Sequence, residues 1–373
     1  HDDYPFLTGG GARPLSVCAD LPLAALFLET DDARRGRVVK KLLRALDECC
    51  AQHGRRLDPL ADRVTDVAAA SDLALLLARA TRGELDLTDR LPMPDWLDEI
   101  LFAWIQDDRF VDPGAEGMVP PLSGGDVFRV GLYAGDGALT ALGAQLFRHS
   151  RLPAASVTGR MLEAADCAML EAESGRPPRL RYAATARNLV MSARMPGLYC
   201  ALHVGGGRSN AGDCLLFSDG QPILTEAGAD CAARNLPTLN GQPQLAAPDP
   251  ACIADFEARS DREILSVDLT GAYPKACGLR ACQRTLLTLR SEQTIRLVDA
   301  LTLEPAAEVA FSFVTPERPA ADGDYLRLGP VRMSWEGALS PELRALGGGL
   351  TQILLRPTQP VSQGLFTFDF EIL

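Results

Sequence analysis

The sequence is poor in histidine and in aromatic residues, and it contains no long apolar run. Its 373 residues include 4 histidines, and aromatic residues make up 6% of the chain. No two histidines stand at the spacing of zinc ligands, and the HExxH, GxSxG and P-loop patterns are absent. These absences argue against a zinc enzyme, an α/β-hydrolase and a P-loop NTPase. No run of about 18 apolar residues predicts a membrane span.

The 10 cysteines show neither a disulfide-framework spacing nor a CxxC pair. Several lie inside apolar periodic segments, where a thiol behaves as a small hydrophobe: Cys167, Cys200, Cys214 and Cys282. This usage favours a reducing, cytoplasmic compartment. No secretory signal is visible. Because the chain begins at His1 and not at Met, we expect an N-terminal portion to be missing.

The chain is acidic, with a net charge of −12 and a pI near 4.9. A surface of this sign repels polyanions, so a nucleic-acid partner is not expected. An acidic saccharide would need a local basic groove, whereas a neutral one would not.

The first part of the chain has the periodicity of helices joined by short loops. Helices are predicted over residues 21–29, 33–53, 66–81, 94–106, 126–134, 136–149 and 157–172. The stretch ESGRPP, residues 173–178, breaks any helix and is the predicted linker. Residues 1–178 are therefore expected to form an α-only domain, and composition leaves a bundle, a solenoid and a toroid open.

After the linker the apolar period changes to two, which is typical of strands. Strands are predicted over residues 187–194, 198–203, 213–217, 222–226, 264–269, 279–290, 293–303, 307–314, 325–335, 350–356 and 364–372. The tetrapeptide Ser218-Asp219-Gly220-Gln221 predicts a tight hairpin, and residues 290–293 predict a second. Many short strands without intervening helices indicate an antiparallel β-sandwich over residues 179–373.

The segment 195–244 carries a resemblance to a known family. An Asp-Gly hairpin is followed by Glu226-Ala227-Gly228 and then by RNLPTLNGQPQ, residues 234–244. In this arrangement the chain resembles the heparinase II/III-like polysaccharide lyases, and the Tyr-Pro and Arg-rich strand pair from Val267 onward adds to the resemblance. The resemblance implies an incomplete (α/α) toroid over 1–178 followed by the β-sandwich.

The family's catalytic residues are not matched. Its lyases are expected to use an Asn or His, a Tyr and a His to neutralise a uronate, remove a proton and protonate the leaving oxygen. The corresponding stretches here are His1-Asp2-Asp3-Tyr4, residues 58–63 without a tyrosine, and the turn 206–210 without a histidine. The second histidine is replaced by Arg234. Of the zinc ligands that some relatives carry, only Glu226 remains, so no cofactor is expected.

Seven residues remain as candidates for a site. His203 and Tyr273 are the candidate proton-transfer groups. The candidate saccharide-binding residues are Arg208, Asn210, Arg234, Asn235 and Asn240. Structural interpretations are open as well. His203 can be a hydrogen-bonded histidine at a strand end, Tyr273 a packing residue, and Asn240 part of an Asn-Gly turn. Arg208 and Arg234 can form ion pairs with Glu226 or Asp213.

Three functions follow from these patterns. The first is a catalytically impaired pseudoenzyme of the family that binds a saccharide in the cleft between the domains. The second is an active, divergent lyase that performs β-elimination on uronate-containing glycans through His203, Arg208 or Tyr273. The third is a non-catalytic structural or assembly protein, acting as a homodimer.

Overall fold

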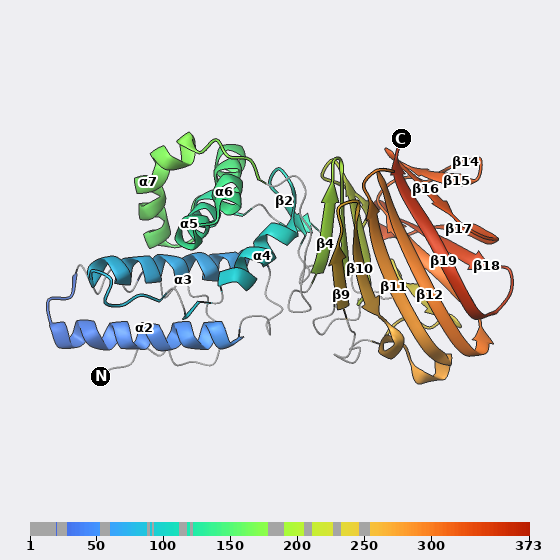
Figure 1. Cartoon of the computed structure of the whole chain (residues 1–373), viewed down its shortest axis with the longest axis horizontal. Helices are drawn as coiled ribbons and strands as arrows, with labels where there is room; N and C mark the ends of the chain where they lie inside the picture. The colour runs from blue at the N-terminus through green and yellow to red at the C-terminus, as the bar shows by residue number, and fades with distance from the viewer. Residues whose placement is uncertain are drawn as a thin grey trace. The chain divides into compact units, whose positions relative to one another are not determined.

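The computed structural model describes residues 20, 28–52, 60–87, 90–91, 93–111, 118–119, 122–177, 190–204, 211–226, 233–245 and 254–373. The chain forms two compact units (Figure 1). The helical unit comprises residues 1–110 and 119–178, and the β unit comprises residues 111–118 and 179–373.

Six helices are seen in the described part of the helical unit. They are α2 (Asp32–Gln52), α3 (Leu60–Ala80), α4 (Met93–Ala103), α5 (Gly124–Ala134), α6 (Gly137–Ser150) and α7 (Val157–Ala172). Helix α5 packs against α3, α6 and α7. The predicted helix over 21–29 lies largely outside the described residues. In the described part, no helix combines the length and apolar character that crossing a membrane requires.

Caps and small residues explain the α5–α7 segment. The Asp136 side chain accepts hydrogen bonds from two backbone amides at the start of α6, and the Ser156 side chain accepts one from the Gly159 amide at the start of α7. Gly135 ends α5 with φ 67°. A Cβ on Gly143 would lie 2.5 Å from the Phe128 Cα atom, so only glycine permits the close approach of α5 and α6.

The expectation of an α-only domain is wrong. The predicted helix over 94–106 ends at Ala103, and the chain continues as β1 (Trp104–Gln106). With β2 (Arg109–Val111) and β3 (Met118–Val119) it forms a three-stranded sheet. The turn at Asp107 has φ 53°, and its carbonyl oxygen accepts a hydrogen bond from the Trp104 indole. This turn and the strand-forming side chains around it override the helical period.

The β unit is built from antiparallel strands. They are β4 (Val190–Met195), β5 (Leu198–His203), β6 (Cys214–Ser218), β7 (Gln221–Leu224), β8 (Pro237–Leu239), β9 (Ala254–Ala258), β10 (Arg262–Asp268), β11 (Leu279–Leu289), β12 (Thr294–Ala307), β13 (Val309–Thr315), β14 (Ala320–Asp322), β15 (Tyr325–Leu328), β16 (Val331–Trp335), β17 (Leu339–Ala345), β18 (Thr351–Pro357) and β19 (Val361–Ile372). The eight-stranded sheet has the order β14-β15-β16-β19-β12-β11-β10-β9. Two four-stranded sheets have the orders β17-β18-β13-β8 and β4-β5-β6-β7.

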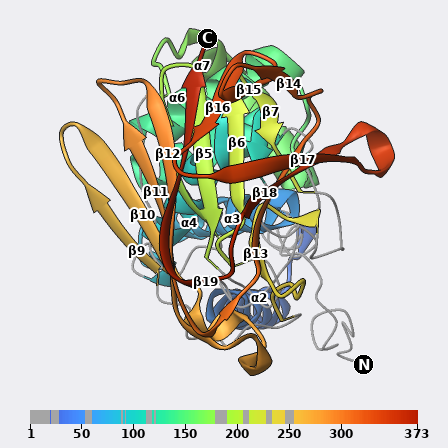
Figure 2. The same ribbon diagram turned by 90° about the vertical axis from the view of Figure 1, so that its right-hand side faces the viewer.

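Phenylalanine side chains join two of these sheets face to face. On β13, Phe313 lies 5.0 Å from Phe368 and 6.0 Å from Phe370 of β19, measured between ring centroids. All three side chains are fully buried. Strands β9 to β12 lie side by side in the larger sheet (Figure 1 and Figure 2). In β10 every second residue is buried, as the period of two predicts.

Both predicted hairpins are confirmed. Ser218 pairs with Gln221 across Asp219 and Gly220, whose φ values of 45° and 73° are those of a tight two-residue turn. The second hairpin joins β11 to β12 through residues 290–293. The single strand predicted over 325–335 is wrong, because a turn at Gly329, with φ 57°, divides it into β15 and β16. The short or polar strands β8, β9, β14 and β17 have too little apolar alternation to be predicted.

Candidate functional site

Four ionisable side chains meet at one edge of the β4–β7 sheet. His203 is the last residue of β5, Asp213 directly precedes β6, and Glu226 follows β7. Antiparallel pairing brings the end of β5, the start of β6 and the end of β7 to the same edge. Arg234 completes the group, which we call the His203 cluster.

The His203 cluster is an ion-pair network enclosed in the fold. The Nε2 atom of His203 lies 2.7 Å from one oxygen of Glu226, and Nη1 of Arg234 lies 2.8 Å from the other. A longer contact of 3.9 Å joins Arg234 to Asp213. The side chain of His203 is 1% exposed and that of Asp213 is fully buried. A pairing of Arg234 with Glu226 or Asp213 was one of the two interpretations open from sequence.

The charges in this network set its protonation states. Burial would raise the pKa of Glu226, but His203 and Arg234 beside it lower that pKa to about 2. Burial would lower the pKa of His203, yet the Glu226 carboxylate outweighs it and the pKa is raised. For Asp213, burial and the Glu226 charge raise the pKa to about 6. These shifts favour the imidazolium form of His203 beside an ionised Glu226 carboxylate.

An imidazole oriented by a carboxylate is also the arrangement of many catalytic bases. A base must be neutral and within reach of the proton it removes. In this structure His203 is enclosed by the fold and the Glu226 carboxylate raises its pKa, and both properties disfavour a role as a base.

Tyr273 is likewise turned inward. Its hydroxyl donates a 2.7 Å hydrogen bond to the carbonyl oxygen of Pro237, and the residue is 4% exposed. Burial raises its pKa well above the ordinary value. Nearby, the Gln244 amide donates to the Ala211 carbonyl at 2.8 Å. These contacts join segments of the β unit, in agreement with the packing interpretation of Tyr273.

Asn235 uses its whole side chain to hold strands together. Its amide nitrogen donates to the carbonyl oxygens of Cys214 and Thr225, at 2.8 and 2.9 Å. Its amide oxygen accepts a 2.6 Å hydrogen bond from the backbone of Val314, and its backbone N–H donates to Asp213. The residue is fully buried. It thus links β6, β7 and β13.

The remaining candidates differ in position. Asn240 has φ 50° in an exposed turn, and its side chain accepts a hydrogen bond from the Glu308 backbone N–H. Arg208 and Asn210 lie outside the described residues. The structure thus places His203 and Arg234 together through Glu226, whereas Asn240 stands apart in its turn. A role for any of these residues in contacting a saccharide stays a prediction.

Arg284 and Asp299 form a buried pair that is not among the predicted site residues. Two hydrogen bonds of 2.7 Å join them, and both side chains are fully buried. Arg284 also donates to the carbonyl oxygens of Gly212, at 3.0 Å, and of Asn235. The sequence did contain a signal for this pair, because both charged residues occupy inward-facing positions of β11 and β12 and lie opposite each other across the two strands.

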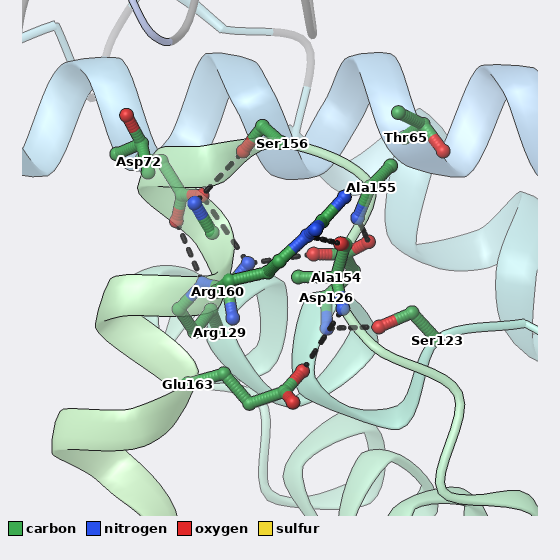
Figure 3. A network of polar contacts seen from close by, with 12 residues as sticks. Thr65, Asp72, Ser123, Asp126, Arg129, Ala154, Ala155, Ser156, Arg160 and Glu163 are labelled. Atoms are coloured by element: carbon green, nitrogen blue, oxygen red, sulfur yellow. Dashed lines mark hydrogen bonds and ion pairs between the residues drawn. The ribbon is translucent and has the colours of Figure 1, made fainter.

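The helical unit has its own buried network, drawn in Figure 3. Arg129 on α5 contacts both oxygens of Asp72 on α3, at 2.8 and 3.2 Å. The same guanidinium lies 2.6 Å from Asp126. Burial raises the pKa of Asp72 to about 6, despite the opposing charge of Arg129. The Glu163 carboxylate accepts from the Ala154 backbone, so the network also holds the segment before α7.

The residues around Glu226 do not fit a zinc ion. Both of its oxygens already contact cationic groups, and a guanidinium has no lone pair to offer a metal. Structural zinc takes about four nitrogen, sulfur or oxygen ligands. Within the described ranges, no set of three or more His, Cys, Asp or Glu side chains is arranged to hold a metal ion.

No protein-family model and no curated protein matches the sequence. Solved structures do match. A structure of heparinase III superposes with a TM-score of 0.60 and 12% identity, covering 96% of this chain and 61% of that one. The heparan sulfate lyase HepC from Pedobacter heparinus gives a TM-score of 0.64 and 14% identity, over 98% of this chain and 61% of that one.

This chain therefore spans about three fifths of the length of the structures it matches. At this identity the match establishes the fold and not the activity. The resemblance to heparinase II/III-like lyases is confirmed at that level: nearly the whole chain has the fold of heparinase III structures, with helices followed by antiparallel sheets.

Proposed function

We propose that this protein is a heparinase III-like pseudoenzyme that binds a saccharide without cleaving it. The observation that carries the proposal is the enclosure of both candidate proton-transfer groups. His203 is paired with Glu226, and Tyr273 donates to a backbone carbonyl. This enclosure supports the proposal, because a proton-transfer group must come within hydrogen-bond reach of the C5 proton or the leaving oxygen of a uronate glycan.

We extend the proposal to the architecture. The helices of residues 1–178 are a portion of an (α/α) toroid, and residues 179–373 form a β-sandwich domain. Support comes from the match to heparinase III over 96% of this chain and from the phenylalanine contacts between β13 and β19. A crystal structure of the protein tests both statements.

The functional test follows the unsaturated product of β-elimination. The protein is incubated with heparan sulfate, hyaluronan and alginate, and ultraviolet absorbance is recorded beside an active heparinase III as positive control. We expect no turnover. Binding to a glycan array without turnover supports the proposal, and absence of both favours a structural or assembly role.

Turnover would point to the divergent lyase, and two variants would then locate its groups. Tyr273→Phe removes one hydroxyl and keeps the packing, and His203→Ala removes the imidazole. Turnover that disappears in either variant, at an unchanged melting temperature, would contradict a pseudoenzyme.

A further inference from the structure

The outward face of the eight-stranded sheet contains a hollow of about 670 Å³. Its lining residues come from β9, β10, β11, β12 and β19 and the turn after β10, all within the β unit. A volume of this size lies in the range of small-molecule sites, roughly 300–1,000 Å³. We call this feature the sheet hollow.

Strand register explains where the sheet hollow forms. In one cross-strand row Asp268 pairs with Gln283, Gln283 with Ala300, and Ala300 with Leu365. The next row joins Ala281, Thr302 and Gln363. Alanine at the middle of the first row and at the end of the second leaves space between longer neighbours.

The lining surface is partly apolar, carries several hydrogen-bonding side chains and includes no basic side chain. Carboxylates come from Asp255 and Asp268, amides from Gln283 and Gln363, and hydroxyls from the neighbouring Ser and Thr residues. Asp268 accepts a 2.8 Å hydrogen bond from a backbone N–H at one oxygen, which fixes its orientation. Within the described part of the chain, no hydrogen bond engages the side chains of Gln283, Thr302 or Gln363.

These groups match a ligand with many hydroxyls. Amides donate and accept, whereas carboxylates accept, so vicinal hydroxyls find partners of both kinds. Leu365, which is 70% exposed, offers an apolar contact for the C–H face of a sugar ring. A sulfate or uronate would meet two carboxylates and no cation, on a chain of net charge −12.

We propose that the sheet hollow binds an uncharged oligosaccharide. The proposal rests on the saccharide-binding function above and gives that function a location and a ligand class. An uncharged ligand also predicts that affinity is nearly independent of salt, because no ion pair is formed.

Isothermal titration calorimetry with uncharged hexasaccharides of glucose, xylose and mannose tests the proposal. A heparin hexasaccharide serves as the charged comparator, and each titration is run at about 50 and about 500 mM NaCl. We expect at least one uncharged hexasaccharide to bind with little change between the two salt concentrations.

Variants then locate the binding. Combining Gln283→Ala with Gln363→Ala removes both amides, and Ala300→Trp fills the hollow; we expect either change to weaken binding by about tenfold or more. Gln221→Ala is the matched control, because Gln221 is an exposed strand glutamine on β7 outside the hollow. Melting temperatures confirm that each variant is folded.

The failures are distinguishable. If an uncharged hexasaccharide binds and the variants leave its affinity unchanged, the protein binds saccharides at a site other than the sheet hollow. The proposed function is then supported, and the proposed location is refuted. If only the heparin hexasaccharide binds, or binding decreases steeply with salt, the ligand class is wrong. If no saccharide binds, both the proposed binding site and the proposed saccharide-binding function are refuted.

Discussion

The two units both bury charged networks, but they balance the charge differently. In the helical unit a single guanidinium, that of Arg129, serves two carboxylates. In the His203 cluster two basic side chains, those of His203 and Arg234, contact the Glu226 carboxylate. The outcome is opposite: the pKa of Asp72 is raised to about 6, whereas that of Glu226 is lowered to about 2. In these two networks, the carboxylate that contacts two cations has the lowered pKa, and the carboxylate whose cation is shared with Asp126 has the raised pKa.

Asp213 supports the same conclusion within the β unit. It lies 3.9 Å from Arg234, farther than Glu226 does, and its pKa is raised to about 6. For Asp213, burial outweighs the attraction of the more distant cation. Each of the following variants removes one member of a buried network. The free energy of unfolding then measures how much the charges left without a partner destabilise the fold.

The largest loss is expected from Arg284→Met. It leaves Asp299 fully buried without its only ion-pair partner among the described residues, and it removes the bonds to Gly212 and Asn235. Removing one member of a buried pair costs about 4 kcal/mol of unfolding free energy. Urea unfolding measures it. The double variant with Asp299→Leu should recover part of the loss, and a double variant no more stable than Arg284→Met would contradict this account.

Arg129→Met should cost about 3 kcal/mol at neutral pH, because two buried carboxylates then lose their shared cation. The loss should shrink in acid, where both carboxyls take up protons. The control is Arg35→Ala, which breaks the exposed pair with Asp32. That change should cost about 0.5 kcal/mol or less. Equal losses in the two variants would remove the distinction between buried and exposed pairs.

Arg234→Met should cost less, about 2 kcal/mol, because His203 remains beside Glu226. Thermal and urea unfolding of this variant and of Arg129→Met, recorded in the same buffer, give the comparison directly. A loss larger than that of Arg129→Met would show that counting cations does not rank the two networks.

The last prediction concerns the pH dependence of stability. The folded-state pKa of Asp72 is raised from 3.8 to about 6, so the fold binds a proton more tightly than the unfolded chain. The stability gained is fully present below the unfolded value and is lost as pH rises through the folded one. The stability of Asp72→Asn relative to the natural protein should therefore increase as pH rises across this interval, by about 3 kcal/mol at roughly 1.4 kcal/mol per unit of pKa difference. A pH-independent difference in urea unfolding would refute it.

Much of the fold follows from short-range pattern. The Asp219-Gly220 turn, the period of two in β10 and the caps at Asp136 and Ser156 are all encoded locally. The exception at Trp104 is also local, since a turn residue with positive φ outweighs the helical period.

The candidate site could be predicted only in part. His203 and Arg234 were identified by position, but their meeting at Glu226 depends on strand pairing across two connections. The contact of Arg129 with Asp72 spans 57 residues, so no local pattern encodes it. Long-range ion pairs depend on tertiary packing, and a single sequence does not record them.

Arg284 has a consequence for engineering. Its guanidinium, on β11, holds the carbonyl oxygens of Gly212 and Asn235, two backbone positions that lie 72 and 49 residues away along the chain. A single substitution at Arg284 would therefore release both backbone positions at once, so a redesign of the β unit should keep this arginine.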